Sequence, residues 1–327
     1  MDRIDYKTVF DRLADDESKI CFNARKNYLS CPSLSAFYSI IRKTGTRFRF
    51  RELDGFPGIN TITGWVFWGG ADDILEYHRL VLTDAGFDVK GPDITCDECL
   101  NLVLYHGYGV LAVSDIPVPK NIPPDRICYV KDHLVGRCGW QYFDYFQPHK
   151  GECFLDGGGL DGNTTIQFIK WSRGDFENIY VFEPNPLEKE NCRLQLETLP
   201  FPSIHFFDKA LWNKDESLLF QAYADSRWDA HIDENGQYEL KGVTVDSVLG
   251  NRKISFLKLD VEGAEEKALQ GAKNHILAYR PRMAISIYHE PLDFIRIPLY
   301  LLSLIPDYCF AIRHYHSDPI ETILYVF

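Results

Sequence analysis

The chain has 327 residues, of which 45% are hydrophobic and 14% aromatic, and its formal net charge is −12. This composition can build sizeable cores and excludes an intrinsically disordered chain, and the length favours two domains over one. The acidic balance, with no run of lysines or arginines, argues against a nucleic-acid partner.

The first 60 residues are predicted to be mostly helical. Apolar residues recur at helical spacing in residues 5–15 and 32–45, and glycines near residue 55 end the pattern. Charged residues interrupt the N-terminal stretch every few positions, so we expect neither a signal peptide nor a membrane helix there. The apolar stretch at 297–306 is too short to span a bilayer. We therefore expect a cytoplasmic protein with no membrane span.

Residues 61–145 are predicted to form a small Rossmann-like α/β subdomain. A strand at 64–70 runs into glycines, an amphipathic helix follows at 71–86, and further strands are expected at 87–91 and 107–116. The glycine turn lacks the third glycine of a nucleotide-binding fingerprint. A structural role is therefore favoured over a nucleotide site.

The cysteine pattern argues for reduced thiols. Nine cysteines are scattered along the chain, an odd number that does not suggest a disulfide framework. Cys96 and Cys99 form a CxxC pair, but no second pair stands at zinc-site spacing. Two half-buried thiols are a simpler interpretation than a metal or redox site.

Residues 146–327 alternate strands with helices, which predicts a mainly parallel sheet. The two last strands, at 308–315 and 322–327, are joined by a loop too short for a crossover helix, so they must be antiparallel. Residues 217–249 lack helical period and are predicted to form strands inserted before the fourth strand of the sheet. The other strands and helices of this domain are expected at 152–156, 163–173, 179–184, 186–199, 203–211, 254–260, 264–277, 283–289 and 291–305.

The turn after the first of these strands fits two templates. Gly157, Gly159 and Gly162 satisfy the dinucleotide fingerprint G-x-G-x-x-G. Asp156, Gly158 and Gly162 satisfy D-x-G-x-x-x-G, a turn that binds S-adenosylmethionine. Taken alone, the turn does not decide between the two ligands.

Charge favours the second template. Asp156 and Asp161 would repel a pyrophosphate, whereas a carboxylate about 4 Å from the methionine ammonium gains on the order of 4 kcal/mol at a surface-like dielectric. The antiparallel end of the sheet also suits a methyltransferase better than a dehydrogenase. Glu183 ends the second strand, where an acid binds ribose hydroxyls in both kinds of site.

Several motifs of residues 140–327 together resemble the FkbM family of S-adenosylmethionine-dependent methyltransferases. The most specific element is Lys258-x-Asp260-x-Glu262-Gly263, followed by Ala-Glu. The family usually shows Ala-Asn where this chain has Gly159-Leu160, which leaves the turn without a side chain at 159 and predicts a looser turn. The motifs, in chain order, are "FLDGGGLDGNTT", "VFEPNP", "KALWNKDESLLF", "VTVDSVL", "ISFLKLDVEGAEEKALQGA" and "ETILYVF".

The resemblance implies a class I methyltransferase, Rossmann-like fold with a seven-stranded sheet whose last strand is antiparallel, preceded by the smaller α/β region. It implies O-methylation, with S-adenosyl-L-methionine as cofactor and a sugar, polysaccharide or sugar-linked hydroxyl as acceptor. Two alternatives remain open: an NAD-dependent nucleotide-sugar oxidoreductase and a non-catalytic partner subunit. A homo-oligomer is also left open.

The candidate site residues follow from the rule that ligands of open α/β sheets bind beyond the carboxyl ends of the strands. No metal ion is predicted, but Mg²⁺ or Mn²⁺ at Asp260, Glu262 and His289 is an alternative. His289 is expected to act as a neutral imidazole that takes the acceptor's proton. The carboxylate of Asp208 is expected to bond the adenine amino group, and Trp212 either stacks on adenine or packs in the core. The predicted cofactor-binding residues are Asp156, Gly158, Gly162, Glu183 and Asp208, and the predicted catalytic residues are Asp260, His289, Glu262 and Lys258.

Overall fold

The computed structural model describes residues 5–45, 140–223, 226–316 and 319–327. Between residues 46 and 139 it describes only short strands and two single positions. The chain divides into two compact units. The first contains the described residues up to Ser18 together with Trp140–Arg313 and Thr322–Phe327, and the second contains those of residues 19–139 and 314–321.

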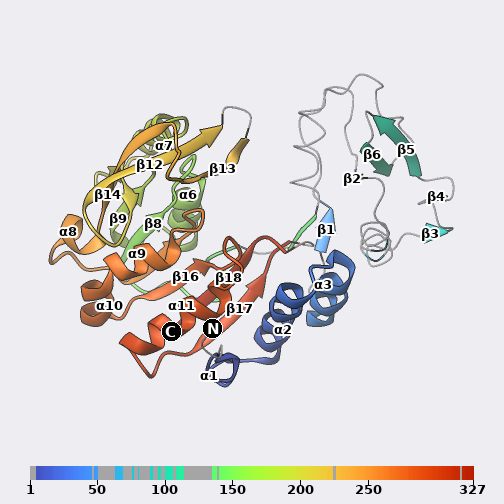
Figure 1. Ribbon diagram of the computed structural model, residues 1–327. Coiled ribbons are helices and arrows are strands. Elements are labelled where there is room, and N and C mark those ends of the chain that lie inside the picture. Colours follow the sequence, from blue (N-terminus) through green and yellow to red (C-terminus); the bar gives the residue numbers. More distant parts are fainter. Residues whose placement is uncertain are drawn as a thin grey trace. The chain divides into compact units, whose positions relative to one another are not determined.

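A seven-stranded sheet forms the centre of the first unit (Figure 1). Its order is β10-β9-β8-β15-β16-β18-β17. The strands β8, β9 and β10 form one half in chain order, and the chain then crosses to β15 on the other side of β8. This crossing point is where open α/β sheets bind their ligands. The strands are β8 (Glu152–Gly157), β9 (Phe176–Phe182), β10 (Ile204–Phe207), β15 (Phe256–Leu259), β16 (Arg282–Ser286), β17 (Phe310–His314) and β18 (Thr322–Val326).

The strand directions confirm the predicted fold class. β9 pairs parallel with β8 and β10, and β15 pairs parallel with β8 and β16. β18 pairs antiparallel with β16. The backbone groups of Cys309 and Phe327 exchange hydrogen bonds of 2.7 and 3.1 Å, as expected of an antiparallel pair at the end of the sheet.

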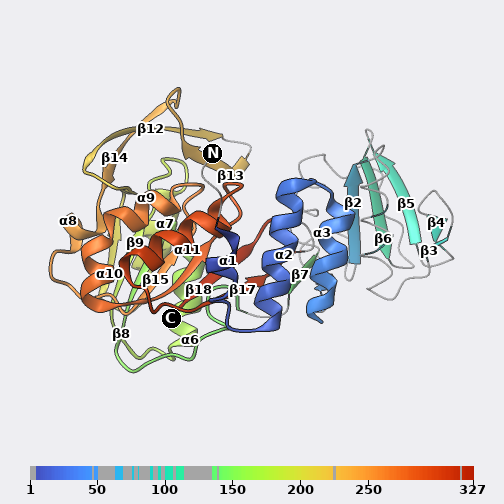
Figure 2. The same ribbon diagram turned by 60° about the horizontal axis from the view of Figure 1, so that its bottom comes forward.

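Helices follow most of the strands. α11 contacts α1, α9 and α10, and these helices lie beside one another in Figure 2. α11 presents its apolar residues to the core, and Phe294, Ile297 and Leu301 are completely buried. The helices of this unit are α1 (Tyr6–Phe10), α6 (Asn163–Trp171), α7 (Lys189–Glu197), α8 (Val245–Leu249), α9 (Glu265–Gly271), α10 (Lys273–Tyr279) and α11 (Asp293–Leu304).

A second sheet of four strands is inserted between β10 and β15, as predicted for residues 217–249. Its order is β11-β14-β12-β13, and β12 pairs antiparallel with both of its neighbours. Phe220, Ala222, Ala230 and Leu240 form its own small core. The strands are β11 (Ala210–Leu211), β12 (Glu216–Tyr223), β13 (Ser226–Ile232) and β14 (Tyr238–Val243).

Aromatic side chains from β8, β15, α6 and the segment before β8 pack together in the core of the first unit. The rings of Phe154 and Phe168 stack with centroids 4.2 Å apart, and Phe143 and Phe256 contact the pair edge-on or tilted. All four side chains are fully buried. Large buried rings supply much of the free energy of folding, so β8, β15 and α6 form a firm base for the turns above them.

The second unit contains helix α2 (Asp16–Ser30) from Lys19 onward, helix α3 (Leu34–Ile41) and a 3₁₀ turn at Arg42–Thr44. Its strands β2 (Thr63–Trp68), β6 (Tyr108–Val113) and β5 (Leu100–Tyr105) pair antiparallel. Apart from Glu76 and Leu80, which are helical, the expected helix at 71–86 lies outside the described residues, as do the glycine turn at 69–73 and Cys99, so the subdomain stays a prediction. The remaining strands are β1 (Phe48–Phe50), β3 (Val89–Lys90), β4 (Thr95–Cys96) and β7 (Val135–Arg137).

Among the helices that the structure describes, none has the length and apolar content that crossing a membrane requires.

Candidate active site

The glycine turn between β8 and α6 is shaped by two left-handed glycines. Gly158 has φ +82° and Gly162 has φ +83°, a conformation that residues with a Cβ adopt only at a cost. A Cβ on Gly158 would lie 1.7 Å from the carbonyl oxygen of Asp260, so the turn touches the end of β15. Gly162 caps the start of α6. Both predicted glycines are therefore needed for the shape of the turn.

The turn is not loosened at Gly159, in contrast to the expectation from the sequence. A Cβ there would lie 2.6 Å from Cγ1 of Val181 and 3.3 Å from Sγ of Cys192. The backbone consequently packs directly against β9. The absence of a side chain at 159 brings turn and sheet closer together.

Asp156 and Lys258 form an ion pair inside the protein. Asp156 is completely buried, and its Oδ1 lies 3.1 Å from Nζ of Lys258 while its Oδ2 accepts a 2.8 Å hydrogen bond from Thr165. Nζ also donates to the carbonyl oxygens of Gly157 (3.0 Å) and Gly158 (2.7 Å). Burial opposes the charge of Lys258, but Asp156 and Asp260 outweigh burial and raise its pKa. Lys258 thus holds the glycine turn, and the expected contact between Asp156 and a methionine ammonium remains a prediction.

Glu183 lies directly after β9 with its carboxylate turned toward the glycine turn. The backbone N–H groups of Leu160 (2.6 Å) and Asn185 (2.8 Å) donate to its two oxygens. Burial raises the pKa of Glu183 to about 7 in spite of these two hydrogen bonds. A carboxylate fixed in this way keeps lone pairs for the hydroxyls of a ribose.

Asp208 differs from the other predicted cofactor-binding residues, because no contact joins its side chain to the glycine turn or to Glu183 among the interactions of the described residues. It follows β10, its side chain is 61% exposed, and it pairs with Lys189 at 3.6 Å. Its proposed contact with the adenine amino group is still a prediction. Trp212 lies elsewhere as well, because it lines a pocket with Glu262 and His289.

Asp260 begins the turn after β15 and is held by two tyrosines. Tyr142 donates a 2.7 Å hydrogen bond to Oδ2, and the hydroxyl of Tyr288 is 3.4 Å from Oδ1. Burial opposes the charge of Asp260, but Lys258 and His289 outweigh burial and lower its pKa. Asp260 is therefore an oriented carboxylate that stays ionised at neutral pH.

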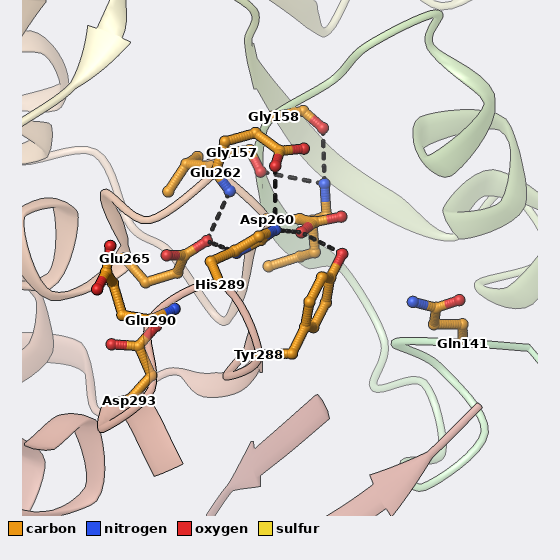
Figure 3. A network of polar contacts seen from close by, with 12 residues as sticks. Gln141, Gly157, Gly158, Asp260, Glu262, Glu265, Tyr288, His289, Glu290 and Asp293 are labelled. Atoms are coloured by element: carbon orange, nitrogen blue, oxygen red, sulfur yellow. Dashed lines mark hydrogen bonds and ion pairs between the residues drawn. The ribbon is translucent and has the colours of Figure 1, made fainter. Parts of the chain in front are cut away.

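His289 lies between three carboxylates, as Figure 3 shows. Its Nδ1 is 2.9 Å from Oε1 of the fully buried Glu265, and its Nε2 is 3.2 Å from Oε2 of Glu262 and 3.6 Å from Oδ1 of Asp260. Burial alone would lower the pKa of His289, but Glu265, Glu262 and Asp260 raise it well above the usual value. The ring is thus protonated at neutral pH in the absence of another cation, whereas the sequence suggested a neutral imidazole.

A pocket of about 370 Å³ opens beside this cluster. The turn after β15 and the turn after β16 form one wall, and the inserted sheet forms the other. The lining residues are Trp212, His231, Ile232, Glu262, Gly263, Ala264, His289 and Glu290. The pocket combines an aromatic ring with several hydrogen-bonding groups, which suits a polar organic ligand.

Two residues of the cluster were missed at the sequence level. Glu265 opens α9, where an acid is common because the helix dipole favours it, so it carried no separate signal. Tyr142 precedes the sheet in an aromatic-rich stretch, and its φ of +72° turns it toward Asp260 in a way that no periodicity predicts. The ligand atoms of Asp260, Glu265 and His289 lie within 4.8 Å of one another, so this cluster can also be considered as a metal site.

Comparisons with known proteins identify the central part of the chain. Residues 156–316 match the model of the methyltransferase FkbM domain, which spans the glycine turn, Glu183, Lys258, Asp260 and His289. No curated protein matches the chain.

Solved structures that are similar to this chain include methyltransferases. The methyltransferase FkbM from Methylobacillus flagellatus KT is 25% identical, with a TM-score of 0.46, over 54% of this chain and 44% of that one. An rRNA methylase from Streptococcus thermophilus is 14% identical, with a TM-score of 0.36, over 55% of this chain and 87% of that one. A methyltransferase from Streptococcus mutans, solved in complex with SAH, is 11% identical, with a TM-score of 0.35, over 55% and 89% of the two chains.

The chain thus spans less than half of the length of the FkbM structure that it matches. Its own matched segment coincides with the β8-to-β17 part of the sheet, where the predicted cofactor and acceptor residues lie. Residues 156–316 of this protein therefore form a methyltransferase FkbM domain.

Proposed function

We propose that this protein transfers a methyl group from S-adenosylmethionine to a hydroxyl group of a sugar or sugar-linked acceptor. The observation that carries the proposal is the contact between two turns within an FkbM domain. The glycine turn after β8 and the acidic turn after β15 meet where Gly158 touches the carbonyl of Asp260. A cofactor at the first turn and an acceptor at the second would therefore be neighbours, as an in-line transfer requires.

The cofactor half of the proposal rests on Glu183 and the glycine turn. Glu183 offers the ribose hydroxyls an anchored carboxylate, and the turn leaves no side chain at Gly158 or Gly159 to obstruct a nucleoside. The ammonium group of Lys258 donates hydrogen bonds to two carbonyl groups of the turn and so holds the turn in place. These features favour an adenosyl cofactor that carries no phosphate, because the carboxylate of Glu183 brings negative charge to the turn, whereas the nearby ammonium of Lys258 is paired with Asp156.

The acceptor half rests on the pocket beside His289. Trp212 can cover the C–H face of a sugar ring, while Glu262, Glu290 and His231 can exchange hydrogen bonds with its hydroxyls. A volume of about 370 Å³ suits one sugar unit better than a flat aromatic cofactor. His289 lines the pocket and Asp260 lies 3.6 Å from its Nε2, so these two side chains would meet the reacting hydroxyl. No described residue favours the NAD-dependent or the non-catalytic alternative.

The test begins with calorimetric titration of S-adenosylhomocysteine into the purified protein. We expect one site per chain, and we expect Glu183→Ala to weaken binding at least about tenfold because it removes the charged hydrogen-bond acceptor. The matched control is Glu190→Ala on the exposed side of α7, which should leave the affinity unchanged. A panel of sugars and nucleotide sugars is then incubated with S-adenosylmethionine and analysed by mass spectrometry for a gain of one methyl group. Absence of cofactor binding at millimolar concentration would refute the proposal.

A further inference from the structure

The cluster around His289 holds more negative charge than its neighbours balance. Asp260, Glu262 and Glu265 place three carboxyl groups around the single imidazole of His289. Lys258 is close, but its Nζ is already bound to Asp156 and to two carbonyl groups of the glycine turn. Uncompensated buried charge is costly, and a bound cation is a common way in which proteins balance it.

The orientation of the His289 ring is that of a metal ligand. Nδ1 faces Glu265, whose Oε1 also accepts a 2.8 Å hydrogen bond from the backbone N–H of Val261 and is therefore fixed in place. Histidines that bind metals commonly give their other ring N–H to such a carboxylate, which orients the ring. Nε2 then faces Glu262 and Asp260, is itself buried, and makes no hydrogen bond.

The distances suit a divalent ion on the Nε2 side. Nε2 lies 3.2 Å from Glu262 Oε2 and 3.6 Å from Asp260 Oδ1. Neighbouring ligands of an octahedral ion with bonds of about 2.1 Å are about 3 Å apart, so a small inward movement of the carboxylates would complete three positions. The hydroxyl of Tyr142 orients the other oxygen of Asp260, which is the kind of support that ligating carboxylates receive.

The remaining positions of the ion would face open space. Glu262 and His289 both line the pocket of about 370 Å³, so water or an acceptor hydroxyl could reach the ion from there. Glu262 reaches the cluster from a backbone with φ +52°, followed by Gly263 with φ +90°. This turn points the carboxylate back toward His289 (Figure 3).

We propose that Asp260, Glu262 and Nε2 of His289 bind one divalent cation, Mn²⁺ or Mg²⁺, and that Glu265 is the residue that positions the histidine. Two carboxylates with one imidazole form a mostly oxygen ligand set, which favours these two ions over softer metals. The ion takes the place of the proton on Nε2. Its task, which rests on the proposed function, would be to bind the acceptor hydroxyl and make its proton more acidic, so that the proton passes to water in the pocket. The oxygen then forms its bond to the methyl carbon while the bond from that carbon to sulfur breaks, and S-adenosylhomocysteine is the leaving group.

The experiment measures Mn²⁺ binding directly on the full chain. Protein is treated with EDTA and dialysed, and free Mn²⁺ is followed by electron paramagnetic resonance during titration. We expect one saturable site per chain, displaced by excess Mg²⁺. We expect His289→Gln and Asp260→Asn to weaken Mn²⁺ binding at least about tenfold, and Glu265→Gln to weaken it about tenfold through loss of ring orientation.

The matched control is His231→Gln, which lines the same pocket but lies outside the cluster, and it should bind Mn²⁺ as the wild type does. S-adenosylhomocysteine titration of every variant in EDTA shows that it is folded and separates the two proposals. Weak, non-saturable Mn²⁺ binding in the wild type, or equal losses in His231→Gln and His289→Gln, would overturn the metal site while leaving cofactor binding intact. Conversely, Mn²⁺ binding without cofactor binding would retain the metal site and refute the proposed function.

Discussion

The two sides of the candidate site differ in how their charges are balanced. On the cofactor side, Asp156, Lys258 and Thr165 pair with one another inside the protein, and the two carbonyl groups of the turn share the same ammonium. On the acceptor side, three carboxylates surround one histidine. Burial together with the charge of Glu265 raises the pKa of the nearby Asp293 to about 7. The first side balances its buried charges with its own side chains, whereas the second has the excess of carboxyl groups for which a cation is proposed.

Because the charges on the cofactor side pair inside the protein, substitutions there should mainly lower the free energy of unfolding. Lys258→Met should lower the free energy of unfolding by about 3–5 kcal/mol, because it leaves the charge of Asp156 buried without its partner. Urea unfolding followed by circular dichroism measures the loss. Adding Asp156→Asn should recover part of the loss, since the unpaired charge is then gone.

The matched control for this prediction is Lys189→Met. Lys189 pairs with Asp208 across 3.6 Å, but both side chains are well exposed, so the loss should be at most about 1 kcal/mol. Equal losses in Lys258→Met and Lys189→Met would contradict the idea that the cofactor side is a buried, self-balanced pair.

A second prediction concerns the place where the two sides touch. Gly158→Ala should destabilise the protein by about 2–4 kcal/mol and strongly weaken S-adenosylhomocysteine binding, because the new Cβ would collide with the carbonyl of Asp260. Gly174→Ala is the control, since Gly174 has a similar φ of +75° but no atom within 4 Å of its Cβ position. It should cost only the backbone strain, about 1–2 kcal/mol. Thermal unfolding and calorimetry compare the two, and similar effects would argue against the close contact.

A third prediction uses pH to examine Glu183. Its pKa is raised to about 7, so the carboxylate form that binds ribose gains population as pH rises from 6 to 8. S-adenosylhomocysteine affinity should therefore increase with pH, by up to about tenfold, and this slope should be absent in Glu183→Gln. The stability effect has the opposite sign: the contribution of Glu183 is present below pH 4.5 and is lost as pH rises through about 7. A pH slope that persists in Glu183→Gln would assign it to another group.

The smallest expected effect belongs to Asp208. If it bonds the adenine amino group as the sequence suggested, Asp208→Ala should weaken S-adenosylhomocysteine binding about fivefold, since the side chain is exposed to water. Guanosine-based analogues, which lack the adenine amino group, should then bind the variant and the wild type alike. An unchanged affinity in Asp208→Ala would confine the cofactor side to buried residues.

The sequence predicted the sheet and the ends of its strands well, because these depend on local patterns. The alternation of strands and helices and the short last loop were enough for the order of the elements and the antiparallel end. Asp260, Glu262 and His289 were correctly expected near each other, since the carboxyl ends of neighbouring parallel strands share one edge.

The partners of these residues could not be predicted, because they depend on packing between distant segments. Period-two alternation places Lys258 on the same side as Asp260 but does not show that its ammonium bonds two carbonyl groups 100 residues away. Tyr142 and Glu265 were missed for the same reason. Asp208 was predicted from its position at the end of a strand, but its side chain is exposed. A strand end alone does not determine whether a side chain turns inward.

The inserted sheet has a consequence for redesign. It supplies Trp212, His231 and Ile232 to the pocket wall, while the turns proposed to hold the cofactor and the reacting groups come from the central sheet. Directed evolution toward new substrates should therefore begin with libraries at His231 and Ile232, where variation can reshape the cavity without disturbing the contact that joins Gly158 to Asp260.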